Sequence, residues 1–408
     1  MTERAWRKTR LADALARDDL RQRARQALAA GPLCDACLGR LFAKVDTGLA
    51  NTDRGRLVRE AVAASPSAQA CPSAEASLSA PACHVCHNLF DTLDPWAVRA
   101  EAALGSLESE TFAVASHADP RIVRREQALW DDVGGDLAEP YKQHFNRSLG
   151  TRLWQATGRE PDLARPEVIV LVDHRTGGVT LRIEPLFLAG RYRKLVRGLP
   201  QCRWKAWPTS IQDIVGEPVR RAADGDDTRF HGCGREDTDV RCLGQRPFIL
   251  EVRRPKRRRL DWAALAAEIN ATGQVEVDGL APSARADVAR LKGLQPDKSY
   301  RAVVELAEDV DDAALGRLAD LVGVVRQRTP MRVLKRRPNR LRRRRVRNLE
   351  WKRLGPRLVE LTVRAQAGTY IKELVSSDGG RTRPSVAEVL GTPAKCVELD
   401  VTAIHVAE

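Results

Sequence analysis

The stretch from His231 to Gly244, HGCGREDTDVRCLG, contains the residue types of a reactive site. Its glycines allow unusual backbone dihedrals and close approach to a ligand. Arg235 and Arg241 flank the acidic residues and could orient a carboxylate or hold phosphates. An aspartate in such a loop can act as a nucleophile, a general base or a metal ligand. Aspartate is also common in ordinary surface turns, so the pattern alone leaves both interpretations open.

Four cysteines form two Cys-x-x-Cys pairs, Cys34 with Cys37 and Cys83 with Cys86. Four thiolates in two such pairs complete a closed tetrahedral zinc site of the structural type. A redox pair or buried free thiols are the alternatives, but two pairs in a protein without a disulfide framework favour zinc. Three nearby residues could substitute as ligands: Cys71, His84 and His87.

The formal net charge of +14 is concentrated in two arginine-rich stretches, 253–259 and 326–347. Together they hold 18 positive charges and no acid, so the remaining chain is slightly negative. Such a localised surplus favours a polyanionic partner, although charge runs are often only solvated tails or targeting signals. Apolar residues interleave with the arginines of the second stretch, which suggests the edges of a folded hairpin rather than a tail.

A third basic segment, 190–201, combines arginines and Lys194 with Tyr192 and turn residues. It could clamp a sugar-phosphate backbone while the tyrosine stacks or packs, and Arg191 and Lys194 are then the RNA contacts. The same composition also fits a basic linker between domains.

The length of 408 residues predicts two or three domains, and 43% hydrophobic residues suffice for packed cores. No stretch approaches the apolar length of a membrane span, and the N-terminus lacks the apolar core of a signal peptide, so we expect a cytoplasmic protein. A Ser-, Ala- and Pro-rich segment at about 63–82 is typical of a flexible insertion.

Hydrophobic periodicity predicts a basic amphipathic helix over 8–30, a helix over 141–154, and strands over 168–173 and 178–184. After about residue 208 the pattern is α+β. It predicts a mixed sheet with helices packed on one side. In this half the expected strands are 248–252, 275–277, 300–306 and 358–365, and the expected helices are 262–269, 313–322 and 368–375.

The segment HGCGREDTDVRCLGQRPF, 231–248, resembles the signature of an archaeal and eukaryotic family of tRNA pseudouridine synthases, the tenth class of these enzymes. Further similar motifs follow in the expected order along nearly the whole chain: CDACLGRLFA, CHVC, the 189–201 segment, RTPMRVLKRR and GTYIKELV with DGGRTRPS after it. The family's usual Leu-Gly-x-Gly-Arg-Pro-Phe is one residue short here, which puts the local geometry beside the site in question.

This resemblance implies an α+β architecture in three parts. A zinc-binding module over 1–92 and a THUMP-like α/β RNA-binding region over 93–200 precede a pseudouridine synthase catalytic domain over 201–408, with a mixed, mainly antiparallel sheet and helices. Structural Zn²⁺ and no organic cofactor are expected. The implied partner is tRNA, modified at uridine 54 or 55 of the T arm, with no obligate protein partner.

The resemblance also implies roles for individual residues. Asp237 matches the catalytic aspartate, and Asp239 is the alternative because an extended strand would put both on one face. Lys372 or Arg235 would keep the aspartate ionised. The target base would be enclosed by Tyr300, stacking on it, and by the apolar walls Ile371 and Leu399. Candidate contacts to tRNA phosphates in the arginine-rich hairpin are Arg342, Arg343 and Arg344.

Two other classes of protein use comparable basic surfaces. One is a non-catalytic RNA-binding or chaperone protein. The other is a THUMP-bearing methyltransferase or thiolation enzyme; a methyltransferase would need a glycine-rich nucleotide loop after a strand, and the sequence contains no such loop.

Whether the aspartate attacks as a nucleophile or removes a proton also stays open.

Overall fold

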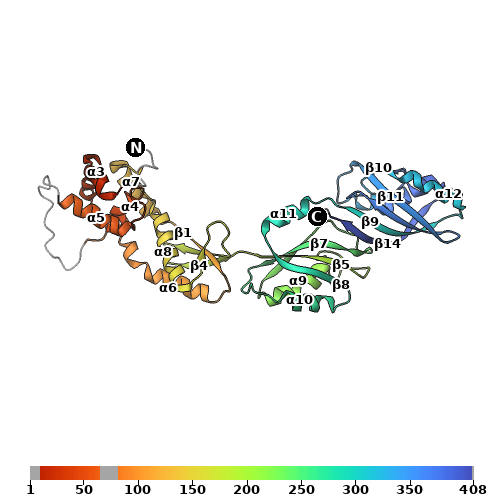
Figure 1. Ribbon diagram of the computed structural model, residues 1–408, viewed down its shortest axis with the longest axis horizontal. Helices are drawn as coiled ribbons and strands as arrows, with labels where there is room; N and C mark the ends of the chain where they lie inside the picture. The colour runs from red at the N-terminus through yellow and green to blue at the C-terminus, as the bar shows by residue number, and fades with distance from the viewer. Residues whose placement is uncertain (1–9, 65–80, 407–408) are drawn as a thin grey trace. The chain divides into compact units, whose positions relative to one another are not determined.

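The computed structural model describes residues 10–64 and 81–406, which form two compact units divided after Glu184 (Figure 1). Cys71 and nearly all of the predicted insertion lie outside the described residues. The second unit begins before the predicted boundary at residue 201, because β5 (Leu186–Lys194) pairs with β7 and β8 of that unit's sheet. The division of the first unit into a zinc-binding module and an RNA-binding region stays a prediction.

The N-terminal part of the first unit is a group of short helices: α2 (Leu11–Leu15), α3 (Asp18–Ala29), α4 (Asp35–Arg40) and α5 (Asn51–Ala63). The single helix predicted over 8–30 is therefore wrong; Arg17 is extended and separates α2 from α3. Helices α4 and α5 cross closely at two glycines. A Cβ on Gly39 would lie 1.8 Å from the Asn51 carbonyl oxygen, and one on Gly55 would lie 1.9 Å from that of Asp35. Larger side chains would force the two helices apart.

The rest of this unit is a four-stranded sheet with helices, as Figure 1 shows. The strand order is β2 (Glu160–Pro161), β1 (Thr111–His117), β3 (Val168–Asp173) and β4 (Val179–Ile183), with β1 parallel to β3. The helices are η1 (Leu89–Thr92), α6 (Asp94–Gly105), α7 (Pro120–Val133) and α8 (Tyr141–Thr157). The strands predicted over 168–173 and 178–184 and the helix predicted over 141–154 are confirmed.

The second unit is built on a ten-stranded sheet of order β13-β10-β11-β12-β9-β14-β7-β5-β8, with β6 on β7. Beyond β5, its strands are β6 (Asp227–Gly232), β7 (Arg241–Arg253), β8 (Val275–Ser283), β9 (Asp297–Leu306), β10 (Gly323–Arg328), β11 (Leu341–Gly355), β12 (Leu358–Ala365), β13 (Thr382–Arg383) and β14 (Ala394–His405). Within the described part of this second sheet, β14 and β7 pair in parallel, at Asp400–Arg241 and Val401–Cys242, and the other pairs are antiparallel. The predicted mixed, mainly antiparallel sheet is confirmed.

Helices cover both faces of this sheet rather than one. Around β5 and β7, α9 (Ile211–Ala222) and α10 (Trp262–Asn270) pack on the face that carries Leu188 and Leu250. Helix α11 (Arg285–Gly293) packs on the opposite face, against Phe187 and Ile249. The β9–β12 half is covered by a second core with short helices: α12 (Asp312–Gly316), η2 (Arg317–Leu321), α13 (Ile371–Ser376) and α14 (Val386–Leu390). The 3₁₀ helix η3 (Met331–Val333) lies in the β10–β11 connection and buries no side chain. The helix expected over 313–322 is thus a short α-helix followed by a 3₁₀ turn. Across the described ranges, the helices are too short or too polar to cross a bilayer.

Candidate active site and metal centre

A cavity of about 870 Å³ opens in the second unit where β14 meets β7. Its walls come from the loop before β7, from β9, from the β10–β11 connection and from the start of α13. Most of the side chains expected to act on the substrate line this one cavity: Arg235, Asp237, Tyr300, Ile371, Lys372 and Leu399. The structure therefore brings together residues separated by more than 160 positions in the sequence.

The Asp237 carboxylate lies beside two cations. Arg332 Nη1 is 3.0 Å from Asp237 Oδ2, and Lys372 Nζ is 3.8 Å from the same oxygen. Among the described residues, Arg332 rather than the predicted Arg235 makes the short ion pair with Asp237. The Asp237 side chain is 40% exposed, so it remains open to the cavity.

Sequence reasoning missed Arg332, although it lies inside the quoted motif RTPMRVLKRR. The short helix η3 carries it, and its Nε donates to Glu373 Oε1 of α13 at 2.7 Å. Burial opposes the charge on Arg332, but Glu373 and Asp237 raise its pKa above the ordinary value. Arg332 is thus a fixed positive charge held between two carboxylates.

Lys372 interacts more closely with Asp239 than with Asp237. Its Nζ is 2.6 Å from Asp239 Oδ2 and 2.8 Å from Oδ1. Burial would raise the pKa of Asp239, but the hydrogen bonds and the charge of Lys372 outweigh it and hold that pKa below its usual range. The cavity therefore contains two ion pairs, Arg332 with Asp237 and Lys372 with Asp239.

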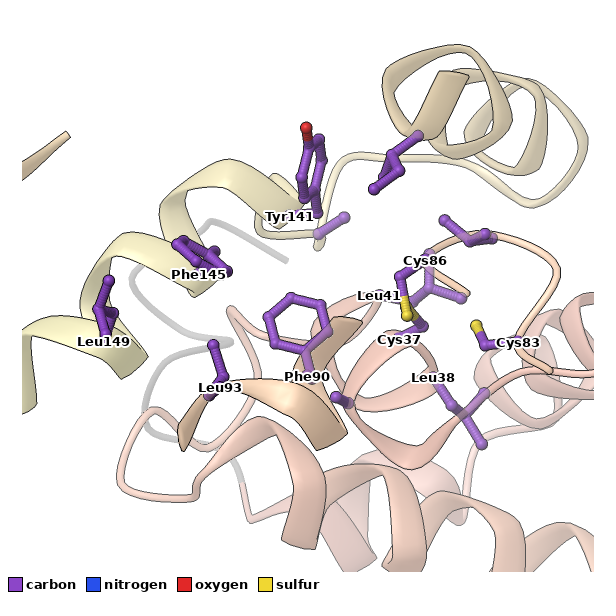
Figure 2. Packing of buried hydrophobic residues seen from close by; sticks show 14 of the residues in the cluster. Cys37, Leu38, Leu41, Cys83, Cys86, Phe90, Leu93, Tyr141, Phe145 and Leu149 are labelled. Atoms are coloured by element: carbon purple, nitrogen blue, oxygen red, sulfur yellow. The ribbon is translucent and has the colours of Figure 1, made fainter. Parts of the chain in front are cut away.

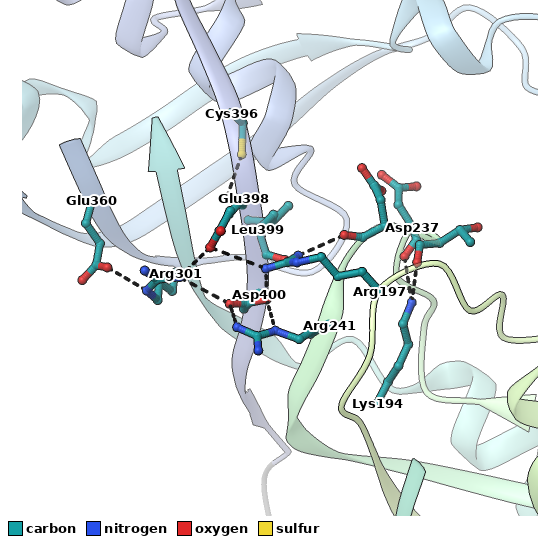
Figure 3. A network of polar contacts seen from close by, with 12 residues as sticks. Lys194, Arg197, Asp237, Arg241, Arg301, Glu360, Cys396, Glu398, Leu399 and Asp400 are labelled. Carbon is teal, nitrogen blue, oxygen red and sulfur yellow. Dashed lines mark hydrogen bonds and ion pairs between the residues drawn. The ribbon is translucent and has the colours of Figure 1, made fainter. Parts of the chain in front are cut away.

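The loop that carries both aspartates is held by the basic segment 194–198, as Figure 3 shows for Lys194 and Arg197. Lys194 Nζ donates to the carbonyl oxygens of Thr238 at 2.8 Å and Asp237 at 3.3 Å, and the Gly198 amide donates to Thr238 at 2.9 Å. Arg197 Nη1 donates to the Asp239 carbonyl at 3.0 Å. Three successive carbonyls of the loop are thus bonded to one segment.

Lys194 is completely buried, and this burial lowers its pKa to about 8. Its ammonium also donates to the Leu199 carbonyl, so its three donors all have main-chain acceptors. The predicted RNA contact for Lys194 does not fit this position, because its charge faces inward. The lysine instead supports the loop.

Glu236, the residue before Asp237, points into the protein. Its side chain is 2% exposed and lies 3.1 Å from Arg246 Nε, which is also buried. The Tyr192 hydroxyl donates to Glu236 at 3.1 Å, and Gln201 bonds both that hydroxyl and the Gly234 carbonyl. Tyr192 therefore packs and bonds inside the protein. These buried contacts fix the main chain directly before Asp237, whose own side chain is 40% exposed.

Asp400 is a second buried anchor, at the parallel pairing of β14 with β7 (Figure 3). It is fully buried and accepts two hydrogen bonds from Arg241, at 2.9 and 2.7 Å, and one from Arg197 at 2.7 Å. Burial would raise the pKa of Asp400, but the arginines, first Arg241, lower it below the usual range. Arg197 also donates to the Leu399 carbonyl at 2.7 Å, which ties the cavity wall to the loop.

The predicted substrate contact for Arg241 is not supported. Two of its guanidinium nitrogens are used by Asp400, directly across from it on β14, and Arg241 is not part of the cavity wall. Arg241 instead helps to fix β14, the strand that carries Leu399.

The apolar wall of the cavity comes from two strands and one helix. Tyr300 on β9 is 8% exposed, and burial raises its pKa to about 12, so its phenol is neutral. Ile371 at the start of α13 and Leu399 on β14 are similarly buried. A flat apolar base fits such walls better than a charged or strongly hydrated group does.

The arginine-rich hairpin β10–β11 presents its arginines on two faces. Arg342 and Arg344 line the cavity, whereas Arg343, which is exposed, points to the other face of the strand. Arg343 lies directly across from Arg326 on β10. Arg191 on β5 is also exposed. In the stretch 253–259, Arg254 and Lys256 pair with nearby aspartates, so part of that charge is neutralised within the protein.

The four predicted cysteine ligands converge in the first unit. The Sγ atoms of Cys34, Cys37, Cys83 and Cys86 all lie within 4.8 Å of one another. A tetrahedral ion with metal–sulfur bonds of about 2.3 Å separates its sulfurs by roughly 3.8 Å, so the cluster fits such an ion. Figure 2 shows three of these cysteines beside apolar residues of the core, among them Leu38, Leu41 and Phe90.

The local backbone explains how these ligands are presented. Cys34 caps the N-terminus of α4 and accepts a bond from the Cys37 amide. The second pair lies in a turn that ends with His87 and Asn88 at positive φ, with Asn88 accepting from the Cys83 amide at 2.8 Å. The four-cysteine cluster does not include His84, whose Nδ1 lies 3.0 Å from the Pro32 carbonyl, or His87.

Comparison with known protein families agrees with this architecture. Residues 96–173 match the model of the archaeal Pus10 THUMP domain, and residues 187–405 match the model of the Pus10 C-terminal region. The protein thus combines a THUMP domain with the C-terminal domain of a pseudouridine synthase.

Curated relatives extend the match over nearly the whole chain. The tRNA pseudouridine synthase Pus10 of Methanothrix thermoacetophila is 38% identical over 94% of both chains. That of Methanothermobacter marburgensis is 40% identical over 91% of this chain and 95% of its own. The chain belongs to the Pus10 family. Among solved structures, a Cbf5-Nop10-Gar1 complex matches with a TM-score of 0.32 at 20% identity, covering 52% of this chain and 47% of that one.

The cysteine cluster predicts one bound metal ion per chain. Cys83→Ser removes one of four converging thiolates, so we expect bound metal per chain to fall to a small fraction of the wild-type value and the first unit to melt at a lower temperature. Elemental analysis and thermal unfolding of the purified full chain measure both. Cys202→Ser, outside the cluster, is the matched control. Wild-type protein purified without chelators and found free of metal would contradict the assignment.

Proposed function

We propose that this protein isomerises uridine to pseudouridine in the T arm of tRNA, at position 54, position 55 or both. The observation that carries the proposal is the Asp237 carboxylate, which is exposed to a cavity with one apolar wall and is paired with Arg332. Family membership supports the reaction, because relatives that match most of the chain are named tRNA pseudouridine synthases. The choice of uridine rests on the resemblance described above.

The reaction needs little besides an acid–base group and an enclosure. The bond between C1′ of the ribose and N1 of uracil breaks, the base turns, a new bond forms from C1′ to C5, and the proton on C5 is lost as N1 gains one. No electrons are exchanged with a cofactor. The target lies within a folded arm, so it must be flipped out at a cost of a few kcal/mol, which phosphate contacts offset.

We assign the reacting carboxylate to Asp237. It acts on the sugar–base unit, either by attack on the sugar or by removal of a proton after the glycosidic bond breaks. Arg332 at 3.0 Å places a positive charge beside it and limits its orientation, and Lys372 adds a second positive charge. Asp239 is less suited to this role, because its carboxylate is already engaged by Lys372 through both oxygens.

Tyr300 would stack on the uracil, and Ile371 and Leu399 would close the sides of its enclosure. A detached uracil must stay in place while it turns, and buried walls without competing water favour this. Arg235 lines the same cavity and is a candidate partner for a phosphate or the sugar.

The remaining basic residues are candidate contacts to the tRNA backbone. Arg342 and Arg344, at the cavity, would bind phosphates near the flipped nucleotide. Arg343 and Arg191, which are exposed elsewhere on this unit, would bind more distant phosphates. We also propose that the cysteine cluster holds structural Zn²⁺ and that the protein acts on cytoplasmic tRNA, with no protein partner needed.

Replacing Asp237 tests the catalytic assignment. Asp237→Asn keeps the size of the side chain but removes its charge, so release of tritium from tRNA labelled at C5 of uridine should fall by 10²-fold or more, in the range typical of a lost acid–base group. Binding of tRNA should stay within a few-fold. Asp239→Asn is the matched control and should retain more activity. If Asp239→Asn is inactive while Asp237→Asn releases tritium at the wild-type rate, the assignment is wrong. A wild-type protein that binds tRNA but releases no tritium would be a non-catalytic binder.

Replacing Arg343 tests the outer face of the hairpin. Arg343→Gln removes one exposed cation that faces Arg326 rather than an acid, so tRNA should bind less tightly and the slope of log K against log salt should decrease by about 1. Arg353→Gln, on the same strand but paired with Asp309 and Asp312, is the control and should leave the slope unchanged. If both variants and the wild type give equal slopes, the face of the hairpin that carries Arg343 does not contact the RNA.

A further inference from the structure

Two tryptophans lie in the wall of the cavity and have no part in the mechanism above. Trp204 and Trp207 belong to the loop between β5 and α9, and both line the cavity. Trp204 is 41% exposed and Trp207 36%. Each ring thus leaves more than a third of its surface exposed, and two such rings on one loop beside a cavity suggest a ligand that covers them.

The loop holds these rings in place through its base and through one arginine. The Ile211 and Gln212 amides donate to the carbonyls of Pro200 and Gln201 at 2.9 and 3.0 Å, which closes the loop at its ends. Arg203 pairs with Asp213 at 2.5 Å and with Asp227 at 2.6 Å. The loop is therefore anchored at its ends and at Arg203, and an anchored loop loses less conformational entropy on binding than a free one.

The charges around the rings favour one kind of ligand. The guanidinium carbon of Arg336 lies 4.9 Å from the centre of the Trp204 ring, and Arg337 also lines the cavity. An exposed aromatic ring combined with arginines is the arrangement that binds unpaired nucleotides, because the ring stacks on a base and the arginines meet the phosphates. An apolar protein segment would gain nothing from these cations.

The size of the cavity agrees with a second nucleotide. Its volume of about 870 Å³ is near the upper end of the 300–1,000 Å³ typical of sites for drug-sized ligands. Tyr300, Ile371 and Leu399 already account for one base. The tryptophans line the same cavity, so they offer a separate place for another.

We propose that Trp204 and Trp207, with Arg336, form a stacking subsite for an unpaired nucleobase that neighbours the target uridine in the same RNA. The subsite rests on the proposed function, since it requires a single-stranded RNA segment in this cavity. It would hold the loop of the RNA open while the target base is out of its stack, and it contributes to the selection of substrate rather than to bond making.

The test is a double-mutant cycle between protein and RNA. Dissociation constants are measured by fluorescence anisotropy for full-length wild type and Trp204→Ala with a T-arm hairpin, and with hairpins in which each loop nucleotide in turn is abasic. Trp204→Ala should weaken binding of the intact hairpin roughly tenfold. With the hairpin that lacks the stacked base, the same substitution should change binding less than twofold. Trp204→Phe, which keeps a ring, should stay within about threefold of wild type on the intact hairpin.

Trp154→Ala is the matched control, because Trp154 is 45% exposed on α8 of the first unit and lines no part of this cavity. Its effect should be the same for every hairpin. If Trp204→Ala weakens all hairpins by one common factor, or none, the subsite is refuted. Binding is measured separately from tritium release. If the effect of Trp204→Ala depends on one base but the wild-type protein releases no tritium, the subsite is supported and the proposed function is refuted. If the wild-type protein releases tritium but the effect of Trp204→Ala depends on no base, the proposed function is supported and the subsite is refuted.

Discussion

The candidate site depends on the hydrogen bonds that fix the main chain of residues 237–239. Three successive carbonyls there accept donors from Lys194, Arg197 and the Gly198 amide. Without these bonds, a loop that carries two acidic side chains would be free to move toward water. Because Lys194 is buried, its donors have no water to compete for them, and each bond is correspondingly costly to break. The exposed carboxylate of Asp237 is thus carried on an inflexible backbone.

The second constraint is the burial of Asp400 at the junction of β14 and β7. A buried carboxylate with hydrogen-bonded arginines adds little net stability compared with an apolar pair, but removing one partner is strongly destabilising. This arrangement favours a single register between the two strands. Since β14 carries Leu399 and β7 follows the loop of Asp237, the register fixes the apolar wall relative to the proposed reacting group. Arg197, bonded to Asp400 and to the Asp239 carbonyl, connects the two constraints.

Much of the candidate site could be predicted from the sequence, because its proposed reactive residues lie in motifs with distinctive composition. Asp237 and Lys372 were identified through a family resemblance and do lie in one cavity. The cysteine pairs were identified from spacing alone, and their sulfurs converge. Hydrophobic patterning located β3, β4, β9 and β12 but not β1 or β14.

What the sequence could not reveal was the direction in which each cation points. Lys194 and Arg241 were expected at the RNA or the substrate, yet both are used inside the protein. The partner of Arg241 is Asp400, 159 residues away, and only strand register brings the two together. Arg332 was hidden among many arginines, and its role depends on the short helix η3 and on Glu373. Composition gives the charge of a segment, whereas packing decides which charges are exposed.

The most direct test of this account is the single-turnover rate of Lys194→Met. Methionine fills a similar volume but donates no hydrogen bond, so it releases the carbonyls of Asp237 and Thr238 without opening a large cavity. A loss of positioning of about 1 Å can cost roughly 10²-fold in rate. We therefore expect tritium release from tRNA to slow by about that factor, with tRNA affinity within threefold of wild type. A variant that turns over at the wild-type rate, or whose only defect is weaker tRNA binding, would contradict the claim that Lys194 holds the reacting loop.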